Sequence, residues 1–280
     1  MKSGSRDVPE PLAVDFAALY DHHPEYVARR EAGSFEQAQV DIEVGLFKLP
    51  HLMALLPGPE ALGNVLEIGC ATGELLAALP IARGARGATG ATGARRVGVD
   101  ISAANVMAAQ ARFPSLEFIC GDFRALQAGA FDTVVLSDVL EHVTDDAEFL
   151  HEAALLGRTV LVNLPLEDNW LNRLRRYGPD DVSGHLRRYA LEDGLALVRR
   201  AGLELLGWQR VWIHEGPAEA ARRRLRSQRL GSAFSGGPVQ RTLRRLTSAS
   251  ISAIQPLGRK VFASNLFFAA RLPGRQDPSP

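Results

Sequence analysis

Cysteine is scarce in this sequence: Cys70 and Cys120 are the two among 280 residues. Two thiols are too few for the disulfide framework that stabilises small secreted domains. The chain also opens without the charged segment and the apolar segment that make up a secretory signal peptide. We therefore expect a protein of the reducing cytoplasm.

Long apolar runs and an excess of one charge are also missing. The longest apolar stretches, such as VFASNLFFAARL near the C-terminus, are shorter than the ~20 residues that cross a bilayer. Lys+Arg and Asp+Glu each number 32, so the formal net charge is zero. A nucleic-acid or membrane partner would therefore need a local basic surface, because no overall charge attracts it.

A regular alternation of short β-rich runs and helix-period segments begins at residue 64. This pattern is typical of βαβ units in a parallel sheet and predicts a doubly wound α/β fold. Helices are expected to begin near Glu74, after a Ser102 N-cap and after a Thr144 N-cap, and another to span residues 191–200. The expected strands are 65–68, 96–99, 116–120, 131–136 and 159–163, followed by a strand-like segment at 204–214 and a last strand near 263–272.

A low-complexity stretch, RGARGATGATGARR, occupies residues 83–96. Glycine and alanine offer little surface to bury and much backbone entropy to lose, so we expect a flexible surface insertion. A glycine-rich phosphate cradle is excluded by context, because such loops follow a strand and open a helix, whereas this stretch precedes a strand.

The stretch VLEIGCATGELLAAL predicts a strand, a turn between Gly69 and Gly73, and a helix. Such a turn places backbone N–H groups beside a crevice at the carboxyl ends of the strands. The G-x-G-x-x-G spacing that binds a pyrophosphate is missing, and no P-loop lysine follows Gly73. With the acid Glu67 just before it, the turn suits a ligand that carries positive charge and no phosphate.

Three motifs in order carry a family resemblance. LEIGCATG resembles the first motif of class I S-adenosylmethionine (SAM)-dependent methyltransferases, GVDIS the acidic end of their second strand, and CGDF the end of their third. The resemblance covers about residues 60–215 and a plausible last strand. It implies a mostly parallel, seven-stranded sheet, SAM as cofactor and S-adenosyl-L-homocysteine as product.

The same resemblance implies the cofactor contacts. In that family the acid at Asp100 holds the ribose hydroxyls, the acid at Asp122 faces the adenine amino group, and the glycine turn passes the methionine moiety. The alternative is that these acids are ordinary strand-end caps in a noncatalytic Rossmann-like domain. The implied cofactor-binding residues are Glu67, Gly69, Cys70, Gly73, Asp100, Ile101, Asp122, Phe123 and Ser137.

Two histidines are candidates for the acceptor side. His142 follows the fourth strand in LSDVLEHVTDD, and its imidazole could take a proton from a hydroxyl or ammonium acceptor. His185, in GHLRRY, lies where the resemblance to ubiquinone-type methyltransferases implies an acceptor loop. Either histidine could instead orient or pack its loop. Trp170, Tyr177 and Tyr189 could line the acceptor pocket or pack the same loop.

A metal site is a further possibility near His142. Asp138, Glu141 and His142 stand at i, i+3 and i+4 and share one face if the segment is helical. Two carboxylates and an imidazole can bind a divalent metal. The set resembles the E-x-x-E-H metal site of ubiquinone-biosynthesis O-methyltransferases and small-RNA 2′-O-methyltransferases, with Asp138 replacing the first Glu. Many relatives carry LEHV without a metal, so the expectation is that no metal is needed.

The chain is predicted to divide into an N-terminal helical lid (1–60), a SAM-binding core (61–215), a basic helical insertion (216–262), and a last strand with a tail (263–280). The insertion carries ten Lys or Arg residues and one acid, Glu219. It could contact a peripheral membrane surface, an anionic acceptor or an acidic carrier protein. The alternative is a solvated helix that packs on the core through its apolar stripe.

The predicted activity is methyl transfer to a small-molecule acceptor, at oxygen first and nitrogen second. No nucleic-acid partner is expected, because the place where amino-methyltransferases of DNA carry a [DNS]-P-P-[YF] turn reads SDVL. The alternatives are a macromolecule- or carrier-directed methyltransferase that docks through residues 216–262, and a noncatalytic SAM-binding domain.

Overall fold

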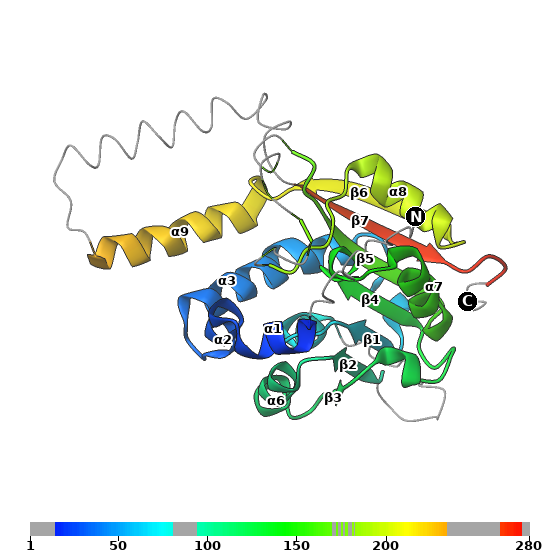
Figure 1. The fold of residues 1–280 in the computed structure, drawn as a ribbon, viewed down its shortest axis with the longest axis horizontal. Coiled ribbons are helices and arrows are strands. Elements are labelled where there is room, and N and C mark those ends of the chain that lie inside the picture. The colour runs from blue at the N-terminus through cyan, green and yellow to red at the C-terminus, as the bar shows by residue number, and fades with distance from the viewer. Residues whose placement is uncertain are drawn as a thin grey trace, which may run out of the picture.

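The computed structural model describes residues 15–80, 94–169, 172, 175, 177, 178, 181, 183–233 and 264–275. In these residues a single seven-stranded sheet runs through the centre, in the order β3-β2-β1-β4-β5-β7-β6 (Figure 1). Strands β1 to β5 pair in parallel, and β7 lies antiparallel between β5 and β6. The predicted doubly wound, mostly parallel sheet is confirmed.

The strands lie close to their predicted positions. The fifth strand is longer than predicted, because its end pairs with the last strand through Leu166 and Ser264. The fourth begins at Thr133 and reaches Ser137, the position where its pairing with β5 ends. The strands are β1 (Val65–Ile68), β2 (Arg96–Asp100), β3 (Glu117–Cys120), β4 (Thr133–Ser137), β5 (Thr159–Leu166), β6 (Glu204–Trp212) and β7 (Ser264–Arg271).

The helices of the core follow the strands as predicted, with one different cap. The Ser102 hydroxyl caps α6 by accepting from the Asn105 N–H. The predicted Thr144 cap of α7 is wrong: the Asp145 carboxylate accepts from the Glu148 N–H instead, and a charged acceptor is the stronger cap at the positive end of the helix dipole. These helices are α5 (Glu74–Ala78), α6 (Ala103–Arg112), α7 (Asp146–Leu156), α8 (Leu191–Arg200) and α9 (Gly216–Ala233).

The N-terminal part forms short helices beside α6 and α9 (Figure 1). Asp15 and Ser34 cap two of them through their side-chain oxygens. These elements are α1 (Phe16–His22), α2 (Pro24–Arg30), α3 (Phe35–Glu43), the π-turn η1 (Val44–Lys48), α4 (Leu49–Met53) and the 3₁₀ turn η2 (Pro59–Leu62).

The sheet has an apolar core on each face, because side chains alternate along each strand. Leu66 and Leu136 pack with α7 and α8 on one face. Val135 and Phe267 pack with η1, α4 and α5 on the other. Covered on both sides, the central strands hold the strand ends, and hence the site residues, in fixed positions.

Two predicted segments fall largely outside the described residues. Of the Gly/Ala-rich insertion at 83–96, residues 83–93 are not described, and of the basic insertion at 216–262, residues 234–262 are not. In the described part of the chain, no helix is both long and apolar enough to cross a membrane.

Candidate active site

The turn after β1 has an unusual backbone. Gly69, Ala71 and Gly73 have positive φ angles of 73°, 45° and 85°. A Cβ on Gly69 would lie 2.6 Å from a methyl group of Val139, so that position accepts no side chain. Ala71 is exposed and keeps its Cβ in the left-handed region, which costs about 1 kcal/mol.

The acid at the end of β2 fastens this turn. The Asp100 carboxylate accepts hydrogen bonds from the backbone N–H groups of Ala71, at 2.8 Å, and Ser102, at 2.9 Å. Burial raises the pKa of Asp100, and these two bonds act in the opposite direction. The glycine turn and Asp100, both predicted as cofactor contacts, are therefore joined by a hydrogen bond. The next residue, Ile101, has an apolar side chain that is 48% exposed.

The other predicted cofactor residues lie in different environments. Asp122 caps η3 (Phe123–Ala125) and pairs with Arg124 at 3.1 Å on the surface. The Phe123 ring is buried in the core, 4.8 Å from the Phe149 ring. Burial raises the pKa of the Cys70 thiol, which lies beneath the turn against Gly98.

Glu67 and Ser137 lie nearer the middle of the sheet. Glu67 is 3% exposed, and burial raises its pKa to about 8. Among the described residues, one of its carboxylate oxygens has no hydrogen-bond partner. Ser137, at the end of β4, accepts a hydrogen bond from the Asn163 amide at 3.1 Å.

Asp138 follows β4 with a positive φ of 57°. One carboxylate oxygen lies 2.6 Å from the Lys48 ammonium and the other accepts from the Asn163 amide at 3.0 Å. Burial alone would lower the pKa of Lys48, but Asp138 and Glu43 raise it, so the ammonium stays charged. Because η4 (Leu140–His142) begins only after Asp138, the expected helical face of Asp138, Glu141 and His142 does not form.

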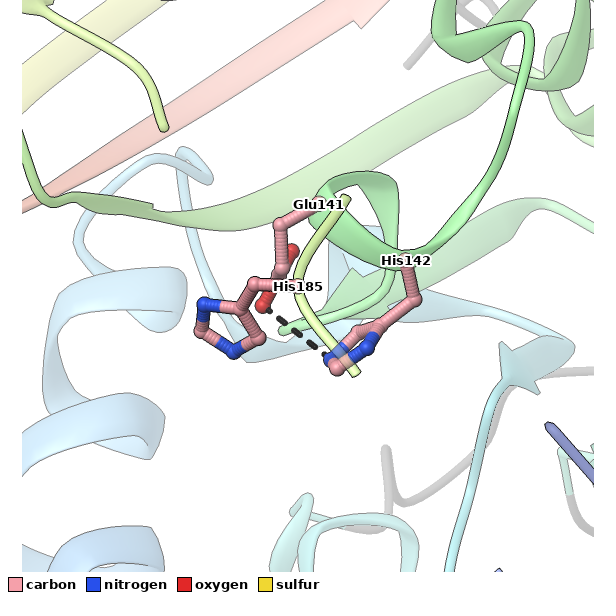
Figure 2. Close-up of side chains that lie close together, drawn as sticks. All are labelled: Glu141, His142 and His185. Carbon is pink, nitrogen blue, oxygen red and sulfur yellow. Dashed lines mark ion pairs between the residues drawn. The ribbon is translucent and has the colours of Figure 1, made fainter. Parts of the chain in front are cut away.

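His142 and His185, predicted separately, meet. Their ring centroids lie 4.8 Å apart at 87°, and His142 Nε2 lies 3.7 Å from a Glu141 carboxylate oxygen (Figure 2). His142 Nδ1 donates to the Gly184 carbonyl at 3.1 Å, and His185 Nδ1 donates to the Glu167 carboxylate at 2.7 Å. With Nδ1 as the donor in both rings, a lone pair of an imidazole lies on Nε2 when that imidazole is neutral.

The electrostatics of this cluster follow from burial. Glu141 is 1% exposed, and neither of its carboxylate oxygens has a hydrogen-bond partner within the described residues. Burial and the nearby Asp138 raise the pKa of Glu141 well above its usual range. Burial and the neighbouring His185 lower the pKa of His142 to about 4, so this imidazole is neutral near pH 7.

Polar contacts fix the loop that carries His185. Arg175 pairs with Glu167 at 2.6 Å and with Asp181 at 2.8 Å. Tyr189 is buried and donates to Asp146 at 2.8 Å, so it packs the loop. Tyr177 lies under the Arg175 guanidinium. Trp170 lies outside the described residues.

Aromatic residues of the N-terminal helices cover the cluster. The rings of Phe16 and Tyr20 each lie 6.0 Å from the His142 ring. Tyr26 lies 5.0 Å from Tyr20 and donates to the Ser183 carbonyl at 3.2 Å. These rings belong to α1 and α2, in the segment for which the sequence predicts a helical lid, residues 1–60.

The lid is anchored at the cofactor end of the sheet. Asp21 accepts from the Ser102 hydroxyl and from the Ala104 N–H. Arg30 donates to the Asn105 side chain at 2.9 Å. Sequence reasoning missed Asp21 and Arg30, as it missed Lys48 and Glu167, because no local pattern marks a residue whose partner lies on another element.

Comparisons with known proteins agree with this geometry. Residues 66–158 match the family model described as a methyltransferase domain. A search of curated proteins gave no match.

Solved structures share the fold at low identity. A SAM-dependent methyltransferase of Thermotoga maritima, described as a possible histamine N-methyltransferase, has 16% identity and a TM-score of 0.54 over 90% of this chain and 98% of its own. Phosphoethanolamine N-methyltransferase 2 of Haemonchus contortus has 19% identity and a TM-score of 0.59 over 93% and 60%. Magnesium protoporphyrin IX methyltransferase of Synechocystis PCC 6803 has 14% identity and a TM-score of 0.50 over 91% and 95%.

At these identities the structural likeness establishes the fold alone. The strand order, the glycine turn fastened to Asp100 and the family match together show that residues 66–158 belong to a methyltransferase domain.

Proposed function

We propose that the chain transfers a methyl group from SAM to a small-molecule acceptor, and that the acceptor atom is an oxygen. The observation that supports this best is the pair of imidazoles, His142 and His185, each with its lone pair on Nε2, beneath an aromatic lid at the end of β4. Nitrogen is the second choice of acceptor atom.

The residues at the turn fit the cofactor. SAM supplies a methyl group bound to a sulfonium sulfur, and the neutral thioether that forms when this bond breaks is a good leaving group. Asp100 offers a buried carboxylate that can accept hydrogen bonds from ribose hydroxyls, and Ile101 offers an exposed apolar face for the adenine ring. Glu67 adds an acid near the turn. The left-handed glycine positions allow close approach of the backbone.

The imidazole pair favours oxygen because a neutral hydroxyl is a poor nucleophile. An Nε2 lone pair can bind the hydroxyl proton, or a cation that in turn binds the hydroxyl oxygen, and both raise the nucleophilicity of that oxygen. An amine needs less assistance, because it already has a nucleophilic lone pair once it loses its proton to solvent. Alignment and exclusion of water then complete the catalysis.

The lid favours an acceptor of small size. The rings of Phe16 and Tyr20 lie against His142. The Tyr26 ring packs on Tyr20, and its hydroxyl donates a hydrogen bond to the Ser183 carbonyl. Two of the similar structures are named for methylation of phosphoethanolamine and magnesium protoporphyrin IX, and the third is described as a possible histamine N-methyltransferase; all three compounds are small molecules.

A second proposal concerns delivery of the acceptor. Helix α9 carries Arg223 and Arg226, which share the single acid Glu219, and the exposed Arg224. The helix extends away from the sheet (Figure 1). An acidic carrier protein or an anionic membrane that presents the acceptor would fit this basic surface.

The test is transfer of radiolabelled methyl from SAM into a cell lysate, followed by separation into small-molecule, lipid, protein and nucleic-acid fractions. We expect label in the small-molecule fraction. Matched acceptors that differ only by hydroxyl for amino then decide between oxygen and nitrogen. Label that appears only in protein or nucleic acid would contradict the proposal.

Variants connect the activity to the site. His142→Ala and His185→Ala are expected to lower kcat by about 100-fold while the Kd for SAM stays unchanged. His151→Ala is the matched control, because His151 also bonds a backbone carbonyl through Nδ1, that of Ala201, but lies on α7 away from the cluster. Full activity of both site variants would remove these histidines from the mechanism.

A further inference from the structure

We infer that Glu141, His142 and His185 bind a divalent transition-metal ion at the acceptor end of the site. The inference deepens the proposed function, and its link to the acceptor rests on that proposal. Among the described residues, these three form the group of potential ligands whose donor atoms all lie within 4.8 Å of one another. Figure 2 shows the Glu141 carboxylate turned toward the two rings.

First, Glu141 is a buried acid whose carboxylate has no hydrogen-bond partner in the described part of the chain. Its side chain is 1% exposed, and neither carboxylate oxygen has a hydrogen-bond partner within the described residues. A buried polar group without a partner costs about 1–3 kcal/mol, and a charged one costs more. A cation bound between Glu141 and the imidazoles would supply the missing partner for both oxygens.

The second argument is the orientation of the histidines. Metal-binding histidines almost always donate their other ring N–H to a carboxylate or a backbone carbonyl, which fixes the ring and the tautomer. His185 donates to the Glu167 carboxylate and His142 to the Gly184 carbonyl. Both Nε2 lone pairs are thereby preset for a ligand.

The third argument is rigidity. The Leu186 N–H donates to the Glu141 carbonyl at 2.8 Å, which joins the loop of His185 to the turn of Glu141 and His142. Arg175 holds Glu167 at 2.6 Å, so the residue that orients His185 is itself fixed. Two ligands of one tetrahedral zinc-like ion lie about 3.4 Å apart, so the donor atoms, which lie within 4.8 Å of one another, must move closer by at most about 1.4 Å.

The structure favours His185 over Asp138 as the third ligand beside Glu141 and His142. The carboxylate of Asp138 is occupied by Lys48 at 2.6 Å and by Asn163 at 3.0 Å. His185, from a distant part of the chain, takes the place that the sequence pattern gave to Asp138.

The donor set indicates the ion and its use. Two imidazoles and one carboxylate favour Zn²⁺, Mn²⁺, Fe²⁺ or Co²⁺ over Mg²⁺ or Ca²⁺. Three protein ligands leave a coordination position open for an acceptor oxygen, whose hydroxyl proton then passes to solvent. The oxygen lone pair forms the bond to the methyl carbon, the carbon–sulfur bond breaks, and its electron pair goes to sulfur.

The experiment measures metal binding directly, without turnover. The purified full chain is stripped with EDTA, and Co²⁺, Zn²⁺ and Mn²⁺ are each titrated by calorimetry, with Co²⁺ also followed by visible absorption. We expect one ion per chain. Glu141→Gln and His185→Gln should each weaken binding by about 100-fold or more, and Glu167→Gln by about 10-fold.

Two controls make the result specific. Asp138→Asn should keep the site within about 10-fold, because Asp138 is bound by Lys48 and Asn163. His151→Gln should leave binding unchanged. Circular dichroism melting shows that each variant is folded. No binding of any of the three ions to the folded wild-type chain overturns the inference, as does loss of binding in Asp138→Asn with retention in His185→Gln.

The two proposals fail separately. If no ion binds but His142→Ala and His185→Ala still abolish transfer to a small molecule, the metal inference is wrong and the proposed function stands. If one ion binds to these residues but label reaches only macromolecules, the metal site stands and the proposed acceptor class is wrong.

Discussion

The two buried acids of the candidate site, Asp100 and Glu141, differ in their hydrogen bonding. At the cofactor end, the Asp100 carboxylate already accepts two backbone N–H groups, from Ala71 and Ser102. At the proposed acceptor end, the Glu141 carboxylate, which is also buried, has no hydrogen-bond partner within the described residues. The fold therefore completes its own polar contacts at the glycine turn, and leaves those of Glu141 open where we propose that the acceptor binds.

The comparison separates residues that shape the site from residues that await a ligand. Removal of an acid at the cofactor end should disturb both the backbone and SAM binding. Removal of a group at the acceptor end should leave the backbone and SAM binding intact and change transfer. The predictions below test this separation.

The largest effect is expected from Asp100→Asn. The substitution keeps the shape of the side chain but removes a charged acceptor, and the Kd for SAM should rise by about 100-fold, measured by calorimetry. Glu117→Gln is the control, since Glu117 is exposed, is paired with Arg95 and begins β3 at the edge of the sheet away from the turn, and it should change the Kd by less than about 5-fold. Equal effects at the two positions would contradict the role given to Asp100.

Arg30→Ala tests whether the lid belongs to the cofactor end. Arg30 donates to two backbone carbonyls and to the Asn105 side chain. Its loss should loosen the lid and weaken SAM binding by about 5–20-fold. Arg158→Ala, at the opposite end of the sheet and paired with Asp132 at 3.5 Å, serves as the control and should have no effect on the Kd. Unchanged SAM binding by Arg30→Ala would mean that the lid contributes only to the acceptor end of the site.

Glu67→Gln tests the buried acid in β1 through the pH dependence of stability. The folded-state pKa of about 8 lies above the unfolded value of about 4.3. The folded chain therefore favours the protonated acid, and this contribution to stability is lost as the pH rises from about 4.3 to about 8.

Because Gln stays neutral, Glu67→Gln should raise the Tm of the SAM-free protein at pH 9 by about 3–8 °C more than at pH 5. Differential scanning calorimetry at both pH values measures the change. Glu192→Gln, at an exposed position of α8, is the control. A pH-independent difference would mean that Glu67 is ionised in the folded protein.

The smallest effect is expected from Ala71→Gly. Gly relieves the left-handed strain at φ 45° but adds entropy to the unfolded chain, so the free energy of unfolding should change by no more than about 0.5 kcal/mol. Ala108→Gly, within α6, should instead destabilise by about 1 kcal/mol. Urea titration measures both, and a large loss at Ala71 would show that its methyl group packs.

The sequence predicted those features whose causes are local. The first strand lies where it was expected, at Val65–Ile68, because an apolar run ends in a glycine turn. Ser102 caps α6 because the hydroxyl reaches a donor three residues on. Glu141, His142 and His185 were each named as candidates from their motifs.

The features that escaped prediction depend on contacts between distant segments. That His142 and His185 meet, and that Glu167 orients His185, follows from the pairing of β4 with β5 and from the loop after β5. Asp138 was grouped with Glu141 because spacing alone cannot show a left-handed backbone or a lysine from η1. The pattern supplied the ligand types, and the tertiary structure determined which of them assemble.

One lid serves both ends of the site, since Asp21 is bound to Ser102 and Ala104 while Phe16 and Tyr20 lie against His142. We expect opening at one end to expose the other, so that both substrates and both products pass a common gate. Such an arrangement favours an ordered kinetic scheme, in which the methyl donor enters before the gate closes. We expect departure of the spent donor through this gate to be slow, so that a first turnover is faster than those that follow.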